Sequence, residues 1–301
     1  MVFHRNGNSD FSTGSLARRE KTNENLGPQL SNNMTDQIPP PLNRRTVAYL
    51  DQDFLNSPDA RAIRILAEYL EPLAHFRHQK IRDTVVFFGS ARIEEGNGAL
   101  SRYYDEARAL ARMLTEWSDQ FVNGTRRFVV CSGGGPGIME AANRGAAEAG
   151  GKTVGLNIGL PFEQYPNPYI TPELSFEFHY FFMRKFWFAY LAKALVVFPG
   201  GFGTMDELME VLTLTQTGKL AKKMAIILYG SAYWNEIINF PALLKYGMIS
   251  PEDLNLFQFA DDPETAFELL KPGLLSYIEH PETPEMPAIA KSVNPQSPEG
   301  T

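Results

Sequence analysis

The chain has 301 residues, with 28 basic and 35 acidic side chains, a formal net charge of −7 and 44% hydrophobic residues. This length and composition are typical of a globular protein with a sizeable core. The acidic balance, without any long Lys/Arg run, argues against nucleic acid or a membrane surface as the main partner. No apolar run approaches the roughly 20 residues of a membrane span, and the N-terminus lacks the apolar core of a secretory signal. We therefore expect a cytoplasmic protein.

The cysteine and histidine content disfavours a metal site. A single cysteine, Cys131, excludes an intramolecular disulfide and a cysteine-rich zinc site. Of the five histidines, only His75 and His78 share helical i, i+3 spacing. Without a nearby glutamate motif, that spacing is more typical of a surface helix than of a metal site.

Composition divides the chain into two tails and one domain. Residues 1–46 are rich in Asn, Ser, Arg and Gln, and residues 281–301 carry a proline every few positions. Such segments bury too little apolar surface to offset the entropy of ordering, so we expect both to be disordered. The remaining residues, 47–280, are predicted to form a single domain.

Helical and strand patterns alternate along that domain. Helices are expected at 60–80, 99–118, 136–149, 183–193, 204–217 and 233–246, and strands at 84–90, 127–134, 152–158, 174–181, 194–200 and 224–230. The alternation predicts an α/β fold: a Rossmann-like, doubly wound domain whose mostly parallel sheet is covered by helices on both faces. In such sheets, ligands bind beyond the carboxyl ends of the strands.

Three of the predicted strands end in glycine-containing turns, at 89–92, 132–137 and 199–204. Glycines there leave backbone N–H groups uncovered, and the following helix N-terminus favours an anion. Tight turns need glycine for purely structural reasons too, but three such turns on one edge point to a phosphate. The candidate phosphate-binding residues are Ser90, Gly134, Gly135, Gly200, Gly201, Phe202, Gly203 and Thr204.

Two common nucleotide motifs do not fit these turns. A P-loop needs Lys-Ser/Thr after its last glycine, and none of these turns has that pair. A dinucleotide fingerprint needs Gly-x-Gly-x-x-Gly after the first strand, which ends here in Gly-Ser-Ala-Arg. A mononucleotide or sugar phosphate remains.

The longest motif carries a family resemblance. Residues 199–207, PGGFGTMDE, match the Pro-Gly-Gly-x-Gly-Thr-x-x-Glu signature of the Lonely Guy family, long labelled "lysine decarboxylase". Arg184-Lys185 in FFMRK is similar to that family's upstream Met-x-x-Arg-Lys motif, and the likeness runs through SGGGPGIMEAANRGAAEAGG to cover most of 84–230. It implies a Rossmann-like homo-oligomer, without metal or bound organic cofactor, that hydrolyses nucleoside 5′-monophosphates to free base and ribose 5-phosphate.

The resemblance leaves the base open between a cytokinin riboside monophosphate and an AMP-type substrate. Met183 directly precedes Arg184, whereas the family commonly has Met-His-x-Arg-Lys, so the start of this helix is remodelled. The predicted helix within 57–80 lies outside the compact family core and suggests the longer branch of the family.

Arg184 and Glu207 are the catalytic pair that the resemblance implies. Cleavage of an N-glycosidic bond develops positive charge on the ribose, so a carboxylate near the anomeric carbon stabilises it and orients a water. Glu207 is expected in the first helical turn after the third glycine loop. The same residues, Thr204 to Glu207, also form a capping-box pattern, which leaves a purely structural role for Glu207 open.

Smaller expectations concern the neighbours of this pair. Lys185 is a second cation for the site, and Thr213 a further substrate contact. Glu163, in the loop after the third strand, matches by position a substrate contact of the family. Glu210 is expected in solvent or in support of the other site residues.

Two other functions are compatible with parts of the sequence. A non-catalytic nucleotide or molybdenum-cofactor carrier would share the glycine loops, but the presence of both Arg184 and Glu207 argues against it. A pyridoxal-phosphate decarboxylase needs a Schiff-base lysine with a partner for the pyridine nitrogen, and no such constellation is evident. The apolar helices at 181–190 and after Thr204 predict a homodimer or higher homo-oligomer.

Overall fold

The computed structural model describes residues 44–159, 165–220 and 222–280. The described residues from Val47 to His280 belong to one compact unit. The tails predicted to be disordered lie outside the described residues, except for 44–46, which have no regular secondary structure. The domain limits of 47–280 therefore remain a prediction.

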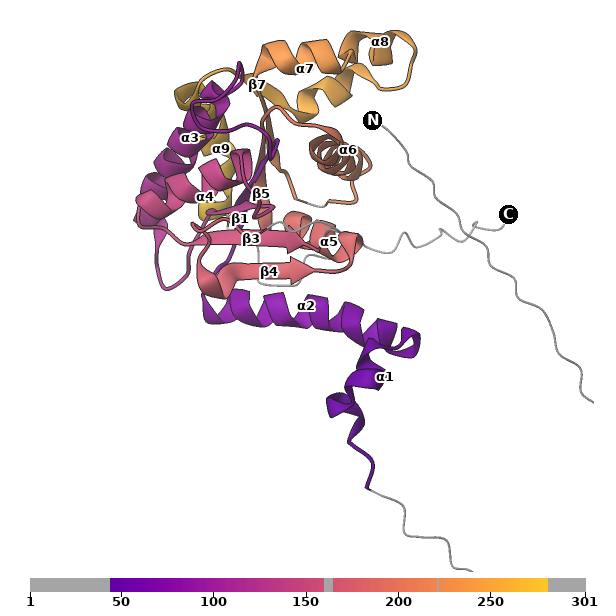
Figure 1. Ribbon diagram of the computed structural model, residues 1–301. Helices are drawn as coiled ribbons and strands as arrows, with labels where there is room; N and C mark the ends of the chain where they lie inside the picture. The colour runs from indigo at the N-terminus through magenta and orange to yellow at the C-terminus, as the bar shows by residue number, and fades with distance from the viewer. Residues whose placement is uncertain (1–43, 160–164, 221, 281–301) are drawn as a thin grey trace, which may run out of the picture. The chain divides into compact units, whose positions relative to one another are not determined.

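A seven-stranded sheet forms the centre of the molecule (Figure 1), in the order β4-β3-β2-β1-β5-β6-β7. Each pair of neighbouring strands in it is parallel. The chain winds outward from β1 to β4 and then from β5 to β7 in the other direction, so the switch point lies between β1 and β5. This confirms the doubly wound, Rossmann-like fold. The strands are β1 Thr84–Phe88, β2 Val129–Ser132, β3 Thr153–Ile158, β4 Ser175–Phe178, β5 Ala192–Val197, β6 Ala225–Tyr229 and β7 Gln258–Ala260.

Helices cover both faces of the sheet (Figure 1). One face packs against α3 (Arg102–Ser118), α4 (Ile138–Glu148) and α9 (Pro263–Glu279). The other packs against α2 (Arg61–His78), α5 (Phe181–Leu191), α6 (Phe202–Gln216), α7 (Ser231–Ile237) and α8 (Phe240–Lys245). Short elements are α1 (Gln52–Asn56) and the 3₁₀ turns Ala48–Leu50, Pro58–Ala60, Asp119–Phe121, Pro172–Leu174 and Pro251–Leu256.

Burial on both faces explains why the strands read as continuous apolar runs. In β1, Val85 and Phe87 join the core beneath α3 and α4, while Val86 and Phe88 join the core beneath α5 and α6. All five residues of β1 are buried.

The predicted helix at 233–246 is wrong as a single element. Asn239 caps the start of α8 with its side chain, and Pro241 occupies its first turn. Because Pro241 has no N–H to donate to the carbonyl of Ile237, and its ring would crowd the preceding turn, one helix cannot run through it, and the chain forms α7 and α8 instead. Two further elements were not predicted from the sequence: β7, which has only three residues, and α9, whose interior holds Pro272 and Gly273.

The helices α3 and α4 approach each other closely enough to exclude a side chain. A Cβ at Gly145 of α4 would overlap the backbone carbonyl of Arg108 on α3. Gly137, which precedes α4, has φ +69° and lies against the backbone of Ser90 and Ala91. Gly145 therefore lets α4 approach α3, and Gly137 lets the loop after β1 approach the start of α4.

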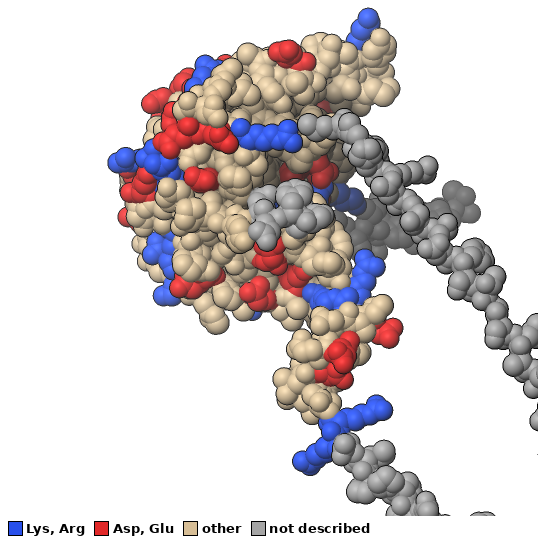
Figure 2. All heavy atoms as spheres, in the orientation of Figure 1, with Lys and Arg blue, Asp and Glu red and all other residues tan. Residues whose placement is uncertain are grey.

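No helix within the described residues is long and apolar enough to cross a membrane. On the face drawn in Figure 2, acidic and basic side chains are interspersed rather than gathered into one basic patch. That distribution matches the mixed charge of the sequence.

Candidate functional site

Backbone hydrogen bonds join the three glycine-containing loops at the switch point. The N–H of Ser90 donates to the carbonyl of Pro199 at 3.0 Å, and the carbonyl of Ser90 accepts from the N–H of Ile138 at 3.1 Å. Ser90 thus links the loop after β1 to the loop after β5 and to the start of α4. The grouping of these loops on one edge, which the sequence predicted, is what the structure has.

A buried polar network holds the second loop. Asn167 donates from its backbone to the carbonyl of Gly134 at 2.8 Å, and its Nδ2 lies 3.1 Å from the carbonyls of Gly134 and Gly135. The same Nδ2 reaches Oδ1 of Asn143 at 2.9 Å, which also accepts from Oγ of Ser132 at 2.6 Å. These asparagines are buried, so each unmade bond would leave a desolvated polar group.

The third loop presents open backbone at the start of α6. Gly201 is the N-cap and supplies no side-chain cap, so the first N–H groups of α6 have no side-chain acceptor from that position. A Cβ added at Gly201 or Gly203 would meet no atom within 4 Å, and the Phe202 side chain is 91% exposed. Thr204, by contrast, is buried against Gly200. This backbone is free to contact a ligand.

Arg184 lies in the first turn of α5 and reaches the carboxyl edge of the sheet. Its Nε donates to the carbonyl of Leu156 at 2.8 Å, and a Cβ at Gly133 would lie 2.6 Å from its Nη2. Burial lowers the pKa of Arg184, and the nearby charge of Glu207 opposes that shift. The guanidinium therefore lies against the second glycine loop and within the electrostatic field of Glu207.

Helix α2, which precedes the first strand, supports the start of α5. The carboxylate of Glu68, on α2, accepts the backbone N–H of His179 at 2.8 Å and of Tyr180 at 3.2 Å. The carbonyl of Glu68 accepts the indole N–H of Trp187 at 2.9 Å. Because Tyr180 is the N-cap of α5, Glu68 satisfies donors that open the helix carrying Arg184.

Glu207 is a buried carboxyl group in the second turn of α6. Burial raises its pKa from 4.5 to about 7, against the lowering effect of Arg184 and Lys185. The capping-box interpretation is wrong: α6 begins at Phe202, two residues before the predicted start, so Thr204 is inside the helix and not its N-cap. Within the described residues, no hydrogen bond ties the Glu207 carboxylate down.

Lys185 forms two ion pairs. Its Nζ lies 2.8 Å from Asp206 Oδ2 and 2.8 Å from Glu210 Oε2, so it joins α5 to α6. Burial disfavours its charge, but these carboxylates outweigh burial and raise the pKa of Lys185. Glu210, expected in solvent or in support of the site, takes the supporting position through this pair.

Of the two further substrate contacts that were expected, Thr213 is not brought to the loops. Thr213 is exposed three turns along α6, and its hydroxyl donates to the carbonyl of Met209 at 2.7 Å. Glu163 lies outside the described residues. The other residues predicted for the site gather at the carboxyl ends of β1, β2 and β5.

Several side chains that position the site had no signal in the sequence. The hydroxyl of Tyr233 donates to the carbonyl of Gly200 at 2.7 Å, and the indole N–H of Trp234 bonds the carbonyls of Val197 and Tyr229 at 3.1 Å. Both residues belong to α7, more than 30 positions from the loop that they support. Only the folded chain brings these partners together.

No cluster of three or more His, Cys, Asp or Glu suited to a metal ion occurs in the described part of the chain.

Comparison with known proteins identifies relatives of this chain. A family model described as "Possible lysine decarboxylase" matches residues 139–270. A cytokinin riboside 5′-monophosphate phosphoribohydrolase of Arabidopsis thaliana is 29% identical over 196 residues, which are 64% of this chain and 81% of that protein. A probable enzyme of the same name from Oryza sativa subsp. japonica is 27% identical over 186 residues, 58% of this chain and 76% of the relative. Over this region the chain is similar to the Lonely Guy family.

Solved structures are similar to this chain at a lower level. The molybdenum cofactor binding protein of Rippkaea orientalis is 19% identical, with a TM-score of 0.43 over 64% of this chain and 97% of that one. At this level the likeness does not distinguish a carrier from an enzyme.

The raised pKa of Glu207 predicts a cost in stability at high pH. The folded state keeps the proton up to about pH 7, whereas the unfolded state loses it near 4.5. The folded state therefore binds more protons between these values, and stability falls as pH rises through them. In Glu207→Gln, this loss of about 2 kcal/mol between pH 5 and pH 8 should disappear. Denaturant unfolding at both pH values measures it, with exposed Glu279→Gln as the control. Equal pH dependence in wild type and Glu207→Gln would contradict the assigned environment.

Proposed function

We propose that the protein hydrolyses the N-glycosidic bond of nucleoside 5′-monophosphates to release the free base and ribose 5-phosphate. The observation that carries this proposal is the buried carboxyl group of Glu207, with no hydrogen-bond partner among the described residues and with Arg184 nearby, beside an open glycine loop. The relatives from Arabidopsis thaliana and Oryza sativa, named as phosphoribohydrolases, support the same reaction class.

The loop at 200–204 offers a place for the 5′-phosphate. The first N–H groups of α6 carry the positive end of the helix dipole, and Gly201 and Gly203 leave them uncovered. Glu207 follows on the same helix within one turn of Thr204. A phosphate held by the loop would therefore keep the ribose near the Glu207 carboxylate.

Ionised Glu207 would serve the reaction in two ways. As the C1′–N bond lengthens, positive charge develops on the ribose, and the carboxylate stabilises it. The oxygen of a water molecule bonds C1′, the base leaves with the electron pair of the broken bond, and the water's proton passes to Glu207 and finally to the base. A carboxyl group with a pKa of about 7 suits proton transfer near neutral pH.

Arg184 would keep Glu207 usable as an anion. Without a cation nearby, burial would hold that carboxyl group in its protonated form. The guanidinium opposes this effect, and its position against Gly133 also lets it contact a bound nucleotide. Fixed by the carbonyl of Leu156, it requires little reorganisation when substrate binds.

Cytokinin riboside monophosphates and AMP-type nucleotides both remain substrates within this proposal. The small-molecule partner is in either case a nucleotide. Decarboxylation through a Schiff base by Lys185, the lysine next to Arg184, is disfavoured because a Schiff-base lysine needs a lowered pKa. The pKa of Lys185 is raised by its two carboxylate partners.

Binding of the phosphate predicts a strong preference for monophosphates. AMP should be hydrolysed at least about 100-fold more efficiently than adenosine, since binding energy from the remote phosphate holds the reacting centre in place. Release of adenine, followed by chromatography, measures both reactions; the second product is ribose 5-phosphate from AMP and ribose from adenosine. In Gly201→Ala, the added methyl meets no protein atom within 4 Å but lies on the open backbone, so the preference should shrink while the fold is retained. Equal turnover of AMP and adenosine by the wild type would exclude the phosphate site.

Removing the charge of Glu207 should abolish most of the turnover. Glu207→Gln keeps the shape of the side chain, yet its kcat for AMP should fall at least about 100-fold. The kcat of Arg184→Ala should fall by a similar factor, and this variant should also bind the nucleotide more weakly. Asp206→Asn is the matched control, because this neighbouring carboxylate on α6 is exposed and pairs with Lys185.

The pH profile provides a second measure of the same carboxylate. In the wild type, kcat/KM should fall as pH drops below about 7, where Glu207 becomes protonated. Residual activity of Glu207→Gln should lack that acid limb. A Gln variant with the wild-type rate would remove Glu207 from the mechanism.

We also propose that the chain assembles into at least a homodimer. Phe181, Phe182, Phe202 and Met209 are exposed on α5 and α6, next to the candidate site. Apolar side chains gathered in this way are typical of an interface. Sedimentation at micromolar concentration should give at least twice the chain mass of 33.8 kDa. Phe181→Glu combined with Phe202→Glu should lower that mass, and a strictly monomeric wild type would contradict the proposal.

A further inference from the structure

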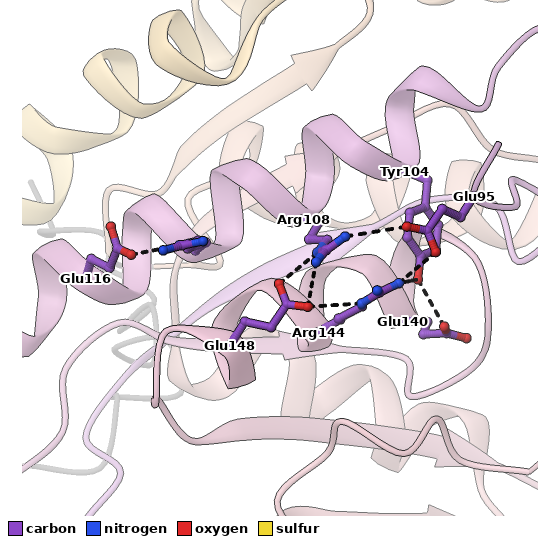
Figure 3. A network of polar contacts seen from close by, with 8 residues as sticks. Glu95, Tyr104, Arg108, Glu116, Glu140, Arg144 and Glu148 are labelled. Carbon is purple, nitrogen blue, oxygen red and sulfur yellow. Dashed lines mark hydrogen bonds and ion pairs between the residues drawn. The ribbon is translucent and has the colours of Figure 1, made fainter.

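A network of charged side chains lies outside the candidate site, on the face of α3 and α4 (Figure 3). Arg108 on α3 forms a bidentate pair with Glu148 on α4, with both N–O distances at 2.7 Å. Arg144 on α4 bonds the same Glu148 at 3.1 Å. Both arginines also reach Glu95, in the loop after β1.

Arg144 is the member of this network with partners in two different loops. Its Nη1 lies 2.8 Å from Glu95 Oε2 in the loop after β1. Its guanidinium carbon also lies 5.6 Å from the ring centroid of Tyr169, in the segment that leads into β4. The side chain is 21% exposed, so water screens these contacts less than it screens a fully solvated pair.

The first contact is connected to Ser90 by a short, internally bonded loop. Glu94 and Asn97 form an antiparallel bridge, and the side chain of Ile93 is buried in the core under α3. Closer to the strand, the Oγ of Ser90 accepts the N–H of Arg92 at 3.0 Å. An anchor at Glu95 therefore restrains the backbone at Ser90, five residues away.

The second contact is connected to the second glycine loop. The N–H of Tyr169 donates to Oδ1 of Asn167 at 3.2 Å, which orients the amide of that asparagine. Asn167 in turn bonds the carbonyls of Gly134 and Gly135. Arg144 is therefore connected to this loop through two residues: it contacts the ring of Tyr169, and Tyr169 bonds Asn167, which holds the loop.

We infer that Arg144 is a positioning residue for the proposed nucleotide site, holding the loop after β1 and the segment 165–171 in register through Glu95 and Tyr169. This role rests on the proposed function for its effect on hydrolysis, but its effect on the loops is independent of any reaction. Arg144 lies on the outer face of α4 and acts through other residues, so it influences nucleotide binding more than the chemical step.

Hydrogen exchange of the backbone amides tests the role directly. In Arg144→Ala, exchange in residues 89–101 and 165–171 should accelerate about fivefold or more, while exchange in the strands stays within about twofold of wild type. With AMP as substrate, KM should rise about fivefold and kcat should change less than about twofold. Arg144→Lys keeps the charge but loses the forked geometry, and should recover part of both effects.

Arg112 provides the matched control. It forms a 2.8 Å ion pair with Glu116 on α3, without a described contact to either loop. Arg112→Ala should match wild type in both measurements. Should Arg144→Ala misfold, Glu95→Gln removes the anchor from the loop side and should accelerate exchange in 89–101 alone.

Exchange rates of Arg144→Ala equal to those of Arg112→Ala in both segments would overturn the inference. So would an equal loss of kcat and kcat/KM, because it would put Arg144 in the chemical step. A wild-type protein that hydrolyses no nucleoside monophosphate would refute the proposed function instead. The exchange rates would still decide the role of Arg144.

Discussion

The backbone of Ser90 occupies the one place where the two halves of the sheet have to meet. A doubly wound sheet leaves a crevice where its connections diverge, here between β1 and β5. Ser90 closes the base of that crevice with one hydrogen bond to Pro199 and another to Ile138. Loops that would otherwise belong to separate βαβ units become one surface. The close packing of Gly137 on Ser90 shows why a side chain is excluded there.

Desolvated asparagines then give that surface its shape. Loops normally expose their polar groups to water, but the second glycine loop is buried and depends on Asn143 and Asn167 for partners. Asn157 fills the space next to Gly134, and its amide bonds the carbonyl of Phe176 at 3.1 Å. Because a buried amide without partners costs about 1–3 kcal/mol, alternative loop conformations are disfavoured. The rigidity of the site thus comes from polar groups that do no chemistry.

The sequence was informative where the physical signal is local. Alternating apolar runs and helical patterns predicted β1 to β6 and the glycine loops at the carboxyl ends of three of these strands. Strand burial and turn geometry depend on residues that are close together in sequence, so they can be predicted from it. Partners distant along the chain were not predictable in this way. Glu68, Tyr233 and Asn167 act on backbone groups far from them in sequence. The start of α6 was misplaced by two residues because Thr204 looks like a cap, whereas Gly201 serves as one.

Two buried acids at opposite edges of the sheet, Asp83 and Glu207, differ in whether their carboxylates have hydrogen-bond partners. Asp83, ahead of β1, accepts the Nε of Arg127 and the N–H of Phe128, both at 2.6 Å, and holds Phe128 at φ +53°. Its oxygens are satisfied, so its burial is explained by the fold. Glu207 has the nearby charge of Arg184 and Lys185 but no hydrogen-bond partner among the described residues. Two donors satisfy Asp83, whereas Glu207 has none beside the candidate site. This arrangement is expected where the missing partners come from a substrate and a water.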